Sequence, residues 1–207
     1  MSSIRGLVLD FGGVISNMRW DVAQELEREH GLERGTLAKT LYTTDEWRAV
    51  EVGRGDIEVW RAASHRALEQ VAGRSMPPLH DRWRATIRLI DQNVELVRAL
   101  KPRYRVAVLS NADVTLEERI RDGLGMADLF DTVVCSAVVG MAKPDHKVYR
   151  LAAKRLELKP EQCLFVDDAE RNVDAAREVG MVAVHHRIYK GDDLAKQLAE
   201  HGVRPKR

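Results

Sequence analysis

Gly6-Leu7-Val8-Leu9-Asp10-Phe11-Gly12-Gly13 is the stretch that decides the fold of this chain. Its apolar run, residues 7–9, has no helical period and precedes a pair of glycines, which predicts a buried strand ending in a tight turn. Asp10 therefore lies where the strand ends and the loop begins. Ligands bind at this carboxyl edge in open α/β sheets. Because an unpaired buried charge is costly, we expect Asp10 to meet partners from distant parts of the chain.

Beyond residue 92, apolar runs and helical patterns alternate along the chain. The apolar runs predict four more strands, at residues 106–109, 132–135, 164–166 and 182–184. Helical spacing predicts helices at about residues 94–100, 116–124, 145–156, 173–179 and 194–198. This alternation is typical of an α/β fold, in which helices cover both faces of a parallel sheet of about five strands.

Residues 16–91 show a different pattern, in which all four tryptophans of the chain occur. Helical spacing predicts four helices here and no strand, at about residues 20–30, 37–41, 57–71 and 79–90. The segment is interpreted as a small helical bundle inserted after the first strand. Trp47 and Arg48 either line a substrate entrance or belong to the bundle's core, and we favour the core.

Composition limits the classes of partner. The chain has 207 residues, 44% of them hydrophobic and 31% charged, with a net charge of +1. So small a net charge predicts no binding to nucleic acid or to an anionic membrane surface, and no apolar run is long enough to span a membrane. Both cysteines, Cys135 and Cys163, lie in apolar runs, as expected for reduced core residues of a cytoplasmic protein.

Three predicted strands end in polar residues that would meet at one edge of the sheet. These are Asp10, then Ser110-Asn111, then Asp167-Asp168, and Lys143 lies in a loop between the last two. Two or three carboxylates suit Mg²⁺, which often bridges to a phosphate. A lysine and a small hydroxyl suit the remaining phosphate oxygens, which would leave Asp10 placed to attack phosphorus and form an aspartyl-phosphate.

Four motifs in a fixed order carry a resemblance to a known family. They are Leu-Asp-Phe-Gly-Gly-Val at Asp10, Val-Leu-Ser-Asn at Ser110, Gly-Met-Ala-Lys-Pro at Lys143 and Phe-Val-Asp-Asp at Asp167. The chain resembles the haloacid dehalogenase (HAD) superfamily over nearly its whole length. Within that superfamily it is similar to the glucose-1-phosphatase-like branch and to the phosphatase domain of soluble epoxide hydrolases. The resemblance implies a Rossmann-like core at residues 1–15 and 92–207 and a helical cap at residues 16–91.

The resemblance also implies a role for each site residue. Asp10 would be the nucleophile, Ser110 and Asn111 would hold the phosphoryl group, and Lys143 would neutralise charge between that group and Asp10. Mg²⁺ would be held by Asp10, Asp168 and the backbone carbonyl of Gly12, with Asp167 close by. The implied reaction is hydrolysis of a small phosphorylated metabolite, such as a sugar phosphate, by a monomer or homodimer.

One residue departs from the pattern of most phosphatases in the family, which carry a second Asp two residues after the nucleophile as general acid and base. Gly12 occupies that position here, as it does in the branch that the chain resembles. A positioned acid or base contributes roughly 10²–10⁴-fold to a rate. Two alternatives therefore stay open: a metal-free 2-haloacid dehalogenase, which fits Asp167-Asp168 poorly, and a domain that binds phosphorylated ligands with little or no turnover.

Overall fold

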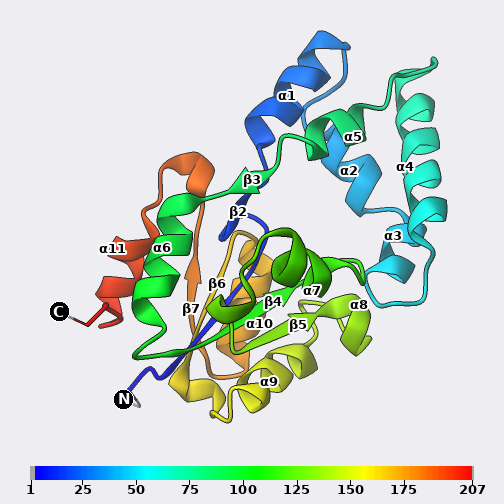
Figure 1. Cartoon of the computed structure of the whole chain (residues 1–207). Helices are drawn as coiled ribbons and strands as arrows, with labels where there is room; N and C mark the ends of the chain where they lie inside the picture. The colour runs from blue at the N-terminus through cyan, green and yellow to red at the C-terminus, as the bar shows by residue number, and fades with distance from the viewer. Residues whose placement is uncertain (1–2, 207) are drawn as a thin grey trace.

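The structure is a computed structural model that describes residues 3–206, with a five-stranded parallel sheet at its centre (Figure 1). The strand order is β5-β4-β1-β6-β7, so the first strand lies in the middle of the sheet. The strands are β1 (Gly6–Leu9), β4 (Arg105–Ser110), β5 (Thr132–Cys135), β6 (Cys163–Asp167) and β7 (Val182–His185). All five strands were predicted by their apolar runs, and this prediction is confirmed.

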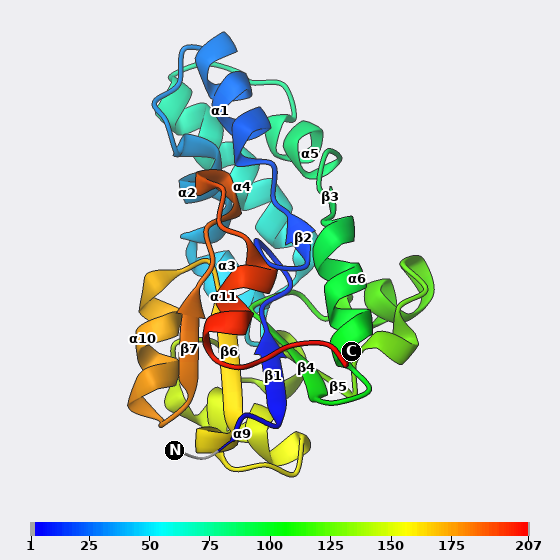
Figure 2. The same ribbon diagram turned by 90° about the vertical axis from the view of Figure 1, so that its left-hand side faces the viewer.

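Helices cover both faces of the sheet, as expected for a Rossmann-like fold (Figure 2). Apolar residues of α6 (Asp91–Leu100) and α11 (Leu194–Glu200) pack on one face. Those of α9 (His146–Arg155) and α10 (Glu170–Glu178) pack on the other. The central strand β1 is fully buried, which is why its sequence is a continuous apolar run rather than an alternating one.

Five further helices pack together beyond one end of the sheet (Figures 1 and 2). Their shared core is rich in indole rings, among them Trp47 and Trp60, whose ring centroids lie 4.7 Å apart. The helices are α1 (Trp20–Glu29), α2 (Thr36–Tyr42), α3 (Asp45–Val50), α4 (Ile57–Ala72) and α5 (Leu79–Arg84). The sequence analysis missed α3, although Thr44 caps its first turn by accepting a hydrogen bond from the backbone N–H of Trp47.

Two predictions for residues 16–91 are wrong. The helix expected over residues 79–90 ends at Arg84, and the segment contains two short strands, β2 (Ser16–Asn17) and β3 (Arg88–Leu89). These strands pair in antiparallel fashion and carry the chain from the sheet to the helices and back. Ile87 and Ile90 continue the helical spacing of α5, but the pairing of β3 with β2 holds the chain extended there.

The remaining elements are short. The helix expected over residues 116–124 is α7 (Leu116–Glu118) followed by a π-helical turn, Arg119–Gly123. A short helix, α8 (Ser136–Val139), follows β5, and 3₁₀ turns occupy Ala127–Leu129, Pro160–Gln162 and Ile188–Lys190. Both cysteines are buried and unbonded, as predicted. Within residues 3–206, no helix combines the length and the apolar character needed to cross a membrane.

Candidate active site

Strand register brings the predicted site residues to one edge of the sheet. Leu9, the last residue of β1, pairs with Val108 of β4 on one side and with Val166 of β6 on the other. Asp10 follows β1 directly, and Ser110 and Asp167 are the last residues of β4 and β6, so all three reach the same carboxyl edge. Convergence of distant motifs follows directly from the parallel pairing.

Lys143 lies at the centre of this cluster and is almost inaccessible, with 1% of its side chain exposed. Its Nζ lies 3.1 Å from Oδ2 of Asp10 and 2.5 Å from Oδ2 of Asp167, whose side chain is fully buried. Burial lowers the pKa of Lys143, but attraction to both carboxylates outweighs this effect and leaves the pKa raised. The lysine is therefore a permanent cation between two carboxylates.

The carboxylate of Asp167 accepts hydrogen bonds from several donors. Besides Lys143, it accepts hydrogen bonds from the backbone N–H of Ala169 at 2.8 Å and from Nδ2 of Asn172 at 3.1 Å. Asn172 was given no role by the sequence analysis, although it lies five residues beyond Asp167 on the helix that follows β6. The arrangement makes Asp167 a rigid support for Lys143.

Asp168 faces the loop that follows β1. Gly13 has a φ of +78°, and a Cβ at this position would overlap with the carboxylate of Asp168, so that the turn can approach Asp168 only as glycine. Burial, followed by the charges of Asp10 and Asp167, raises the pKa of Asp168 to about 7. Burial, partly offset by Lys143, also raises the pKa of Asp10 to about 6.

The acidic cluster has the composition of a divalent-cation site. Asp10, Asp167 and Asp168 each present an oxygen atom, and these oxygens lie within 4.8 Å of one another. Three carboxylates face a single ammonium group, that of Lys143, and the raised pKa values of Asp10 and Asp168 reflect this crowding in a buried place. Carboxylate oxygens are the ligands that Mg²⁺ prefers, so the residues present fit this ion.

Ser110 and Asn111 occupy different positions in the site. Ser110 is buried, and its hydroxyl group acts on Asp10 by lowering the pKa of that carboxyl. The amide of Asn111 instead fixes the lysine loop, because Oδ1 accepts the N–H of Lys143 at 2.8 Å and Nδ2 donates to its carbonyl at 2.9 Å. Asn111 thus positions the backbone that carries Lys143.

The helical segment contributes a residue that the sequence analysis missed. Glu51, which follows α3, accepts a hydrogen bond from Nδ2 of Asn111 at 3.0 Å. Burial raises the pKa of Glu51. The same turn contains Gly53, whose Cβ would overlap with the carbonyl oxygen of Ala137 on α8. This turn therefore lies directly against the edge of the sheet that carries the site.

A cavity of about 130 Å³ separates the site from the helices above it. Gly12, Ser110 and Asn111 line it from the sheet, and Trp47 and Trp60 line it from the helices. Trp47 is 7% exposed in the core of the helical segment, as favoured from the sequence, and it also lines this cavity. The core prediction is wrong for Arg48, whose exposed side chain pairs with Asp45 at 2.7 Å.

A Rossmann-like sheet with a lysine–carboxylate cluster at its carboxyl edge defines a class of hydrolases, and comparison with known proteins identifies the family. The chain belongs to the haloacid dehalogenase-like hydrolases, whose family profile matches residues 4–180. It is 25% identical over 187 residues to D-ribitol-5-phosphate phosphatase of Bacteroides thetaiotaomicron, covering 86% of this chain and 89% of that protein. Two other relatives are longer proteins, of which the chain spans only 36% and 19%.

Solved structures share the fold. A HAD family enzyme from Bacteroides thetaiotaomicron, in complex with magnesium and inorganic phosphate, superposes with a TM-score of 0.67 at 19% identity, covering 94% of this chain and 98% of that one. L-2-haloacid dehalogenase from Xanthobacter autotrophicus superposes with a TM-score of 0.61 at 21% identity, covering 98% and 85%. The fold therefore does not choose between phosphate-ester hydrolysis and dehalogenation, and the choice between these two reactions depends on the side chains of the site.

Proposed function

We propose that this chain is a Mg²⁺-dependent phosphatase that hydrolyses a small phosphorylated metabolite through an aspartyl-phosphate on Asp10. The observation that carries the proposal is the cluster of Asp10, Asp167 and Asp168 around Lys143. Its excess of buried negative charge favours a divalent cation. Similarity to a sugar-phosphate phosphatase supports the same substrate class.

Asp10 is suited to the role of nucleophile by its surroundings. Its Oδ1 accepts the backbone N–H of Phe11 at 2.7 Å, while Oδ2 lies beside Nζ of Lys143 at 3.1 Å. These contacts fix the orientation of the carboxylate at the end of β1. Positioning of this kind lowers the entropic cost of reaching the reactive geometry.

The reaction would proceed in two displacements. An oxygen of Asp10 attacks phosphorus, the bond from phosphorus to the ester oxygen breaks, and the departing alkoxide takes up a proton. Water then attacks the phosphorus of the aspartyl-phosphate, which releases inorganic phosphate and restores the carboxylate. Because Gly12 has no side chain to supply the proton, it must come from water or from another acid of the site.

Different residues of the site would hold the metal ion and stabilise the negative charge of the phosphoryl group. Asp10, Asp168 and the carbonyl of Gly12 would hold Mg²⁺, which would supply positive charge to the phosphoryl oxygens. Lys143 provides a second, fixed cation between Asp10 and the phosphoryl group, and Asp167 keeps it in place. Ser110 would donate to a phosphoryl oxygen from beside Asp10.

We further propose that residues 16–91 form a cap domain on a core of residues 1–15 and 92–207. The β2–β3 ribbon provides the two connections, and Glu51 and Gly53 bring the cap against the site. A cap in this position would exclude water while the aspartyl-phosphate forms and open to release product.

The proposal is tested by phosphate release from p-nitrophenyl phosphate and a panel of sugar phosphates. Release should require Mg²⁺, should stop with a chelator, and should be abolished in Asp10→Asn. Asp128→Asn serves as the matched control, because Asp128 is exposed in a 3₁₀ turn. Release by Asp10→Asn at the rate of the control would refute the proposed nucleophile.

Two other outcomes would point to the alternatives. Chloride release from 2-chloropropionate that persists in chelator would favour the dehalogenase, whose fold this chain shares. Tight binding of phosphorylated compounds without turnover of any panel member would favour a binding role.

A further inference from the structure

We propose that the substrate carries a second anionic group besides the phosphoryl group, and that an arginine-lined pocket between the helical segment and the sheet binds it. This inference rests on the proposed function, since it concerns the substrate of the same site. The pocket has a volume of about 440 Å³. Its charged lining residues are Arg61, Arg84, Arg88, Arg119 and Asp81, and this set is referred to below as the arginine pocket.

The arginine pocket adjoins the cavity above the candidate nucleophile. Phe11, Ser16 and Ile87 line both spaces, and so do Arg84 and Arg119. We therefore expect a molecule whose phosphoryl group lies at the end of β1 to reach the arginine pocket past these shared residues.

The positive charge of the arginine pocket is only partly offset by its surroundings. Arg61 forms an ion pair with Glu58 at 3.1 Å, but among residues 3–206 neither Arg84 nor Arg119 has a carboxylate within ion-pair distance. Asp113, in the adjoining cavity, offsets part of this charge: burial raises the pKa of its carboxyl, but hydrogen bonds from Thr115 and the charges of Arg119 and Arg84 leave that pKa lowered. Two guanidinium groups thus remain available to a ligand.

The guanidinium groups are also held in place. That of Arg84 lies over the ring of Trp60, 5.3 Å from its centroid, in a cation–π contact that fixes its position. Arg119 begins the π-helical turn on the opposite side, so the charges come from both the helical segment and the sheet domain. An anion between them would bind both parts at once.

Charge distinguishes this pocket from the other cavity of similar size. A second space of about 440 Å³ lies beside Asp168, where Arg34 shares the lining with Glu27 and Asp168. That lining has an excess of negative charge and does not favour an anion. The arginine pocket has the opposite balance, with four arginines and one aspartate.

The ligand chemistry follows from the guanidinium group. Its planar donors bind phosphate and carboxylate oxygens in pairs, so a second phosphate and a carboxylate both match the arginine pocket. An alkyl group would leave the arginines without acceptors, and the hydroxyl groups of an uncharged sugar would accept hydrogen bonds without neutralising the positive charge. The expected substrates are sugar bisphosphates or phosphorylated sugar acids rather than simple monophosphates.

The first test compares kcat/KM for a hexose monophosphate, the corresponding bisphosphate and the corresponding phosphorylated sugar acid. The wild-type protein should prefer one of the two substrates that carry two anionic groups, and which of them it prefers identifies the second group. Arg119→Ala should lower the ratio of that kcat/KM to the monophosphate value by about tenfold or more, as expected for a charged hydrogen bond. Arg84→Gln should lower it in the same direction.

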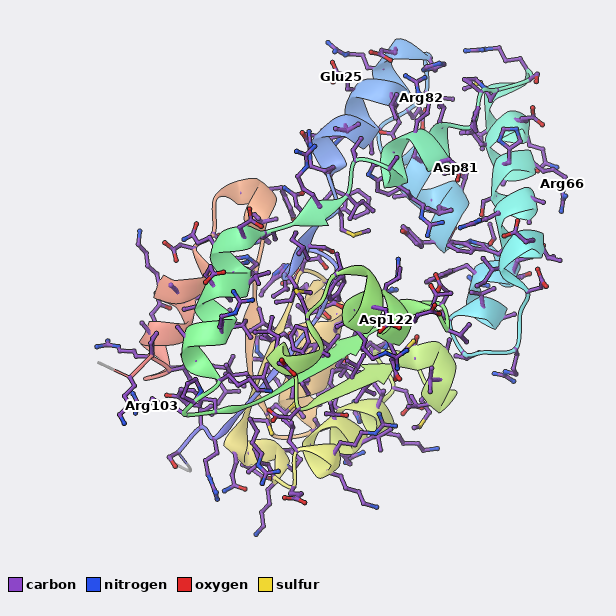
Figure 3. The ribbon with its side chains drawn as sticks, in the orientation of Figure 1. Glu25, Arg66, Asp81, Arg82, Arg103 and Asp122 are labelled. Atoms are coloured by element: carbon purple, nitrogen blue, oxygen red, sulfur yellow. The ribbon has the colours of Figure 1, made fainter. Side chains whose placement is uncertain are left out.

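Arg82→Ala is the matched control, because Arg82 lies on α5 like Arg84 but is exposed and points away from the sheet (Figure 3). This variant should keep the wild-type ratio. An unchanged ratio in both Arg119→Ala and Arg84→Gln, or a wild-type preference for the monophosphate, would overturn the proposal.

A binding measurement separates this proposal from the proposed reaction. Calorimetry with Asp10→Asn and Mg²⁺ should show that the preferred compound with two anionic groups binds more tightly than the monophosphate. Adding Arg119→Ala should remove this difference in affinity. This result would support the arginine pocket even if no substrate were turned over. Equal affinities for all three compounds would refute it even if the protein proved to be a phosphatase.

Discussion

Replacement of Lys143 by methionine tests the electrostatic account of the site most directly. Lys143→Met keeps most of the volume of the side chain and removes its charge. The carboxylates of Asp10 and Asp167 then lose their shared cation, while their exposed fractions stay at 12% and 0%. We expect a large loss of stability in metal-free buffer, together with loss of phosphatase activity.

The magnitude follows from the burial of the three groups. Removing one partner of a buried ion pair costs roughly 3–5 kcal/mol, because the remaining charge stays buried without compensation. The whole free energy of unfolding of a domain is about 5–15 kcal/mol. In a chain of this size, about 1 kcal/mol shifts Tm by roughly 2–4 °C, so Tm should fall by about 6–20 °C.

The loss of stability in Lys143→Met should depend on pH and on Mg²⁺. Burial raises the pKa of Asp10 and Lys143 partly offsets this, so without the ammonium group the pKa of Asp10 rises further, its carboxyl takes up a proton more readily, and the variant recovers part of its stability in acid. Thermal unfolding at pH 8 and at pH 5.5 should therefore show the larger deficit at pH 8. Mg²⁺ should reduce the deficit at pH 8, because it supplies positive charge to the same carboxylates.

Lys147→Met provides the control, because Lys147 is exposed on α9 only four residues away. It should leave both Tm and activity within error of the wild type. If Lys143→Met were as stable as Lys147→Met at pH 8 without metal, the claim that Lys143 stabilises the buried carboxylates would be wrong.

Three further predictions concern other parts of the molecule. Burial, with nearby carboxylates, raises the pKa of Asp168 to about 7, so the folded protein binds a proton more tightly than the unfolded chain; without metal, the free energy of unfolding should fall between about pH 4 and pH 7. Urea denaturation of Asp168→Asn should show a smaller fall in the free energy of unfolding over this pH range. A fall as large as that of the wild type would contradict the raised pKa of Asp168. Gly53→Ala should raise KM and lower the free energy of unfolding by about 1–3 kcal/mol, because the new Cβ would overlap with the carbonyl of Ala137. Gly73→Ala is the control: Gly73 has a similar positive φ but open space around it, so urea denaturation should show a smaller loss of stability. Glu27→Ala should lower the free energy of unfolding by about 1–3 kcal/mol, because the buried carboxylate accepts two backbone N–H groups at the start of α2 at 2.9 and 2.8 Å; a Tm equal to that of the wild type would contradict this.

The sheet could be predicted from the sequence because strands buried on both faces are continuous apolar runs. The same local reasoning failed between residues 79 and 90. Trp83, Ile87 and Ile90 are spaced as on one helix face, yet only the first of them is helical. The pairing of Arg88–Leu89 with Ser16–Asn17, more than seventy residues earlier, overrides that spacing.

The principal site residues also followed from the sequence. Asp10, Ser110 and Asp167 each end an apolar strand, and parallel pairing is enough to bring strand ends together. Lys143 was identified from its motif and not from a strand end, because nothing in its local sequence shows that its loop folds back toward β1.

Only the tertiary structure placed the helical segment over this edge. Glu51 follows α3 and Arg84 ends α5, and the sequences of these helices specify an apolar face but not the direction that each helix takes across the sheet. The contact of Glu51 with Asn111, and the position of Arg84 opposite Arg119, depend on that direction. The sequence by itself therefore determined the central sheet and the carboxylates at its edge, because both follow from apolar strands and their ends, and its motif added Lys143. The tertiary structure alone decided which side chains line the cavities above the site, because these come from elements joined only through long-range packing.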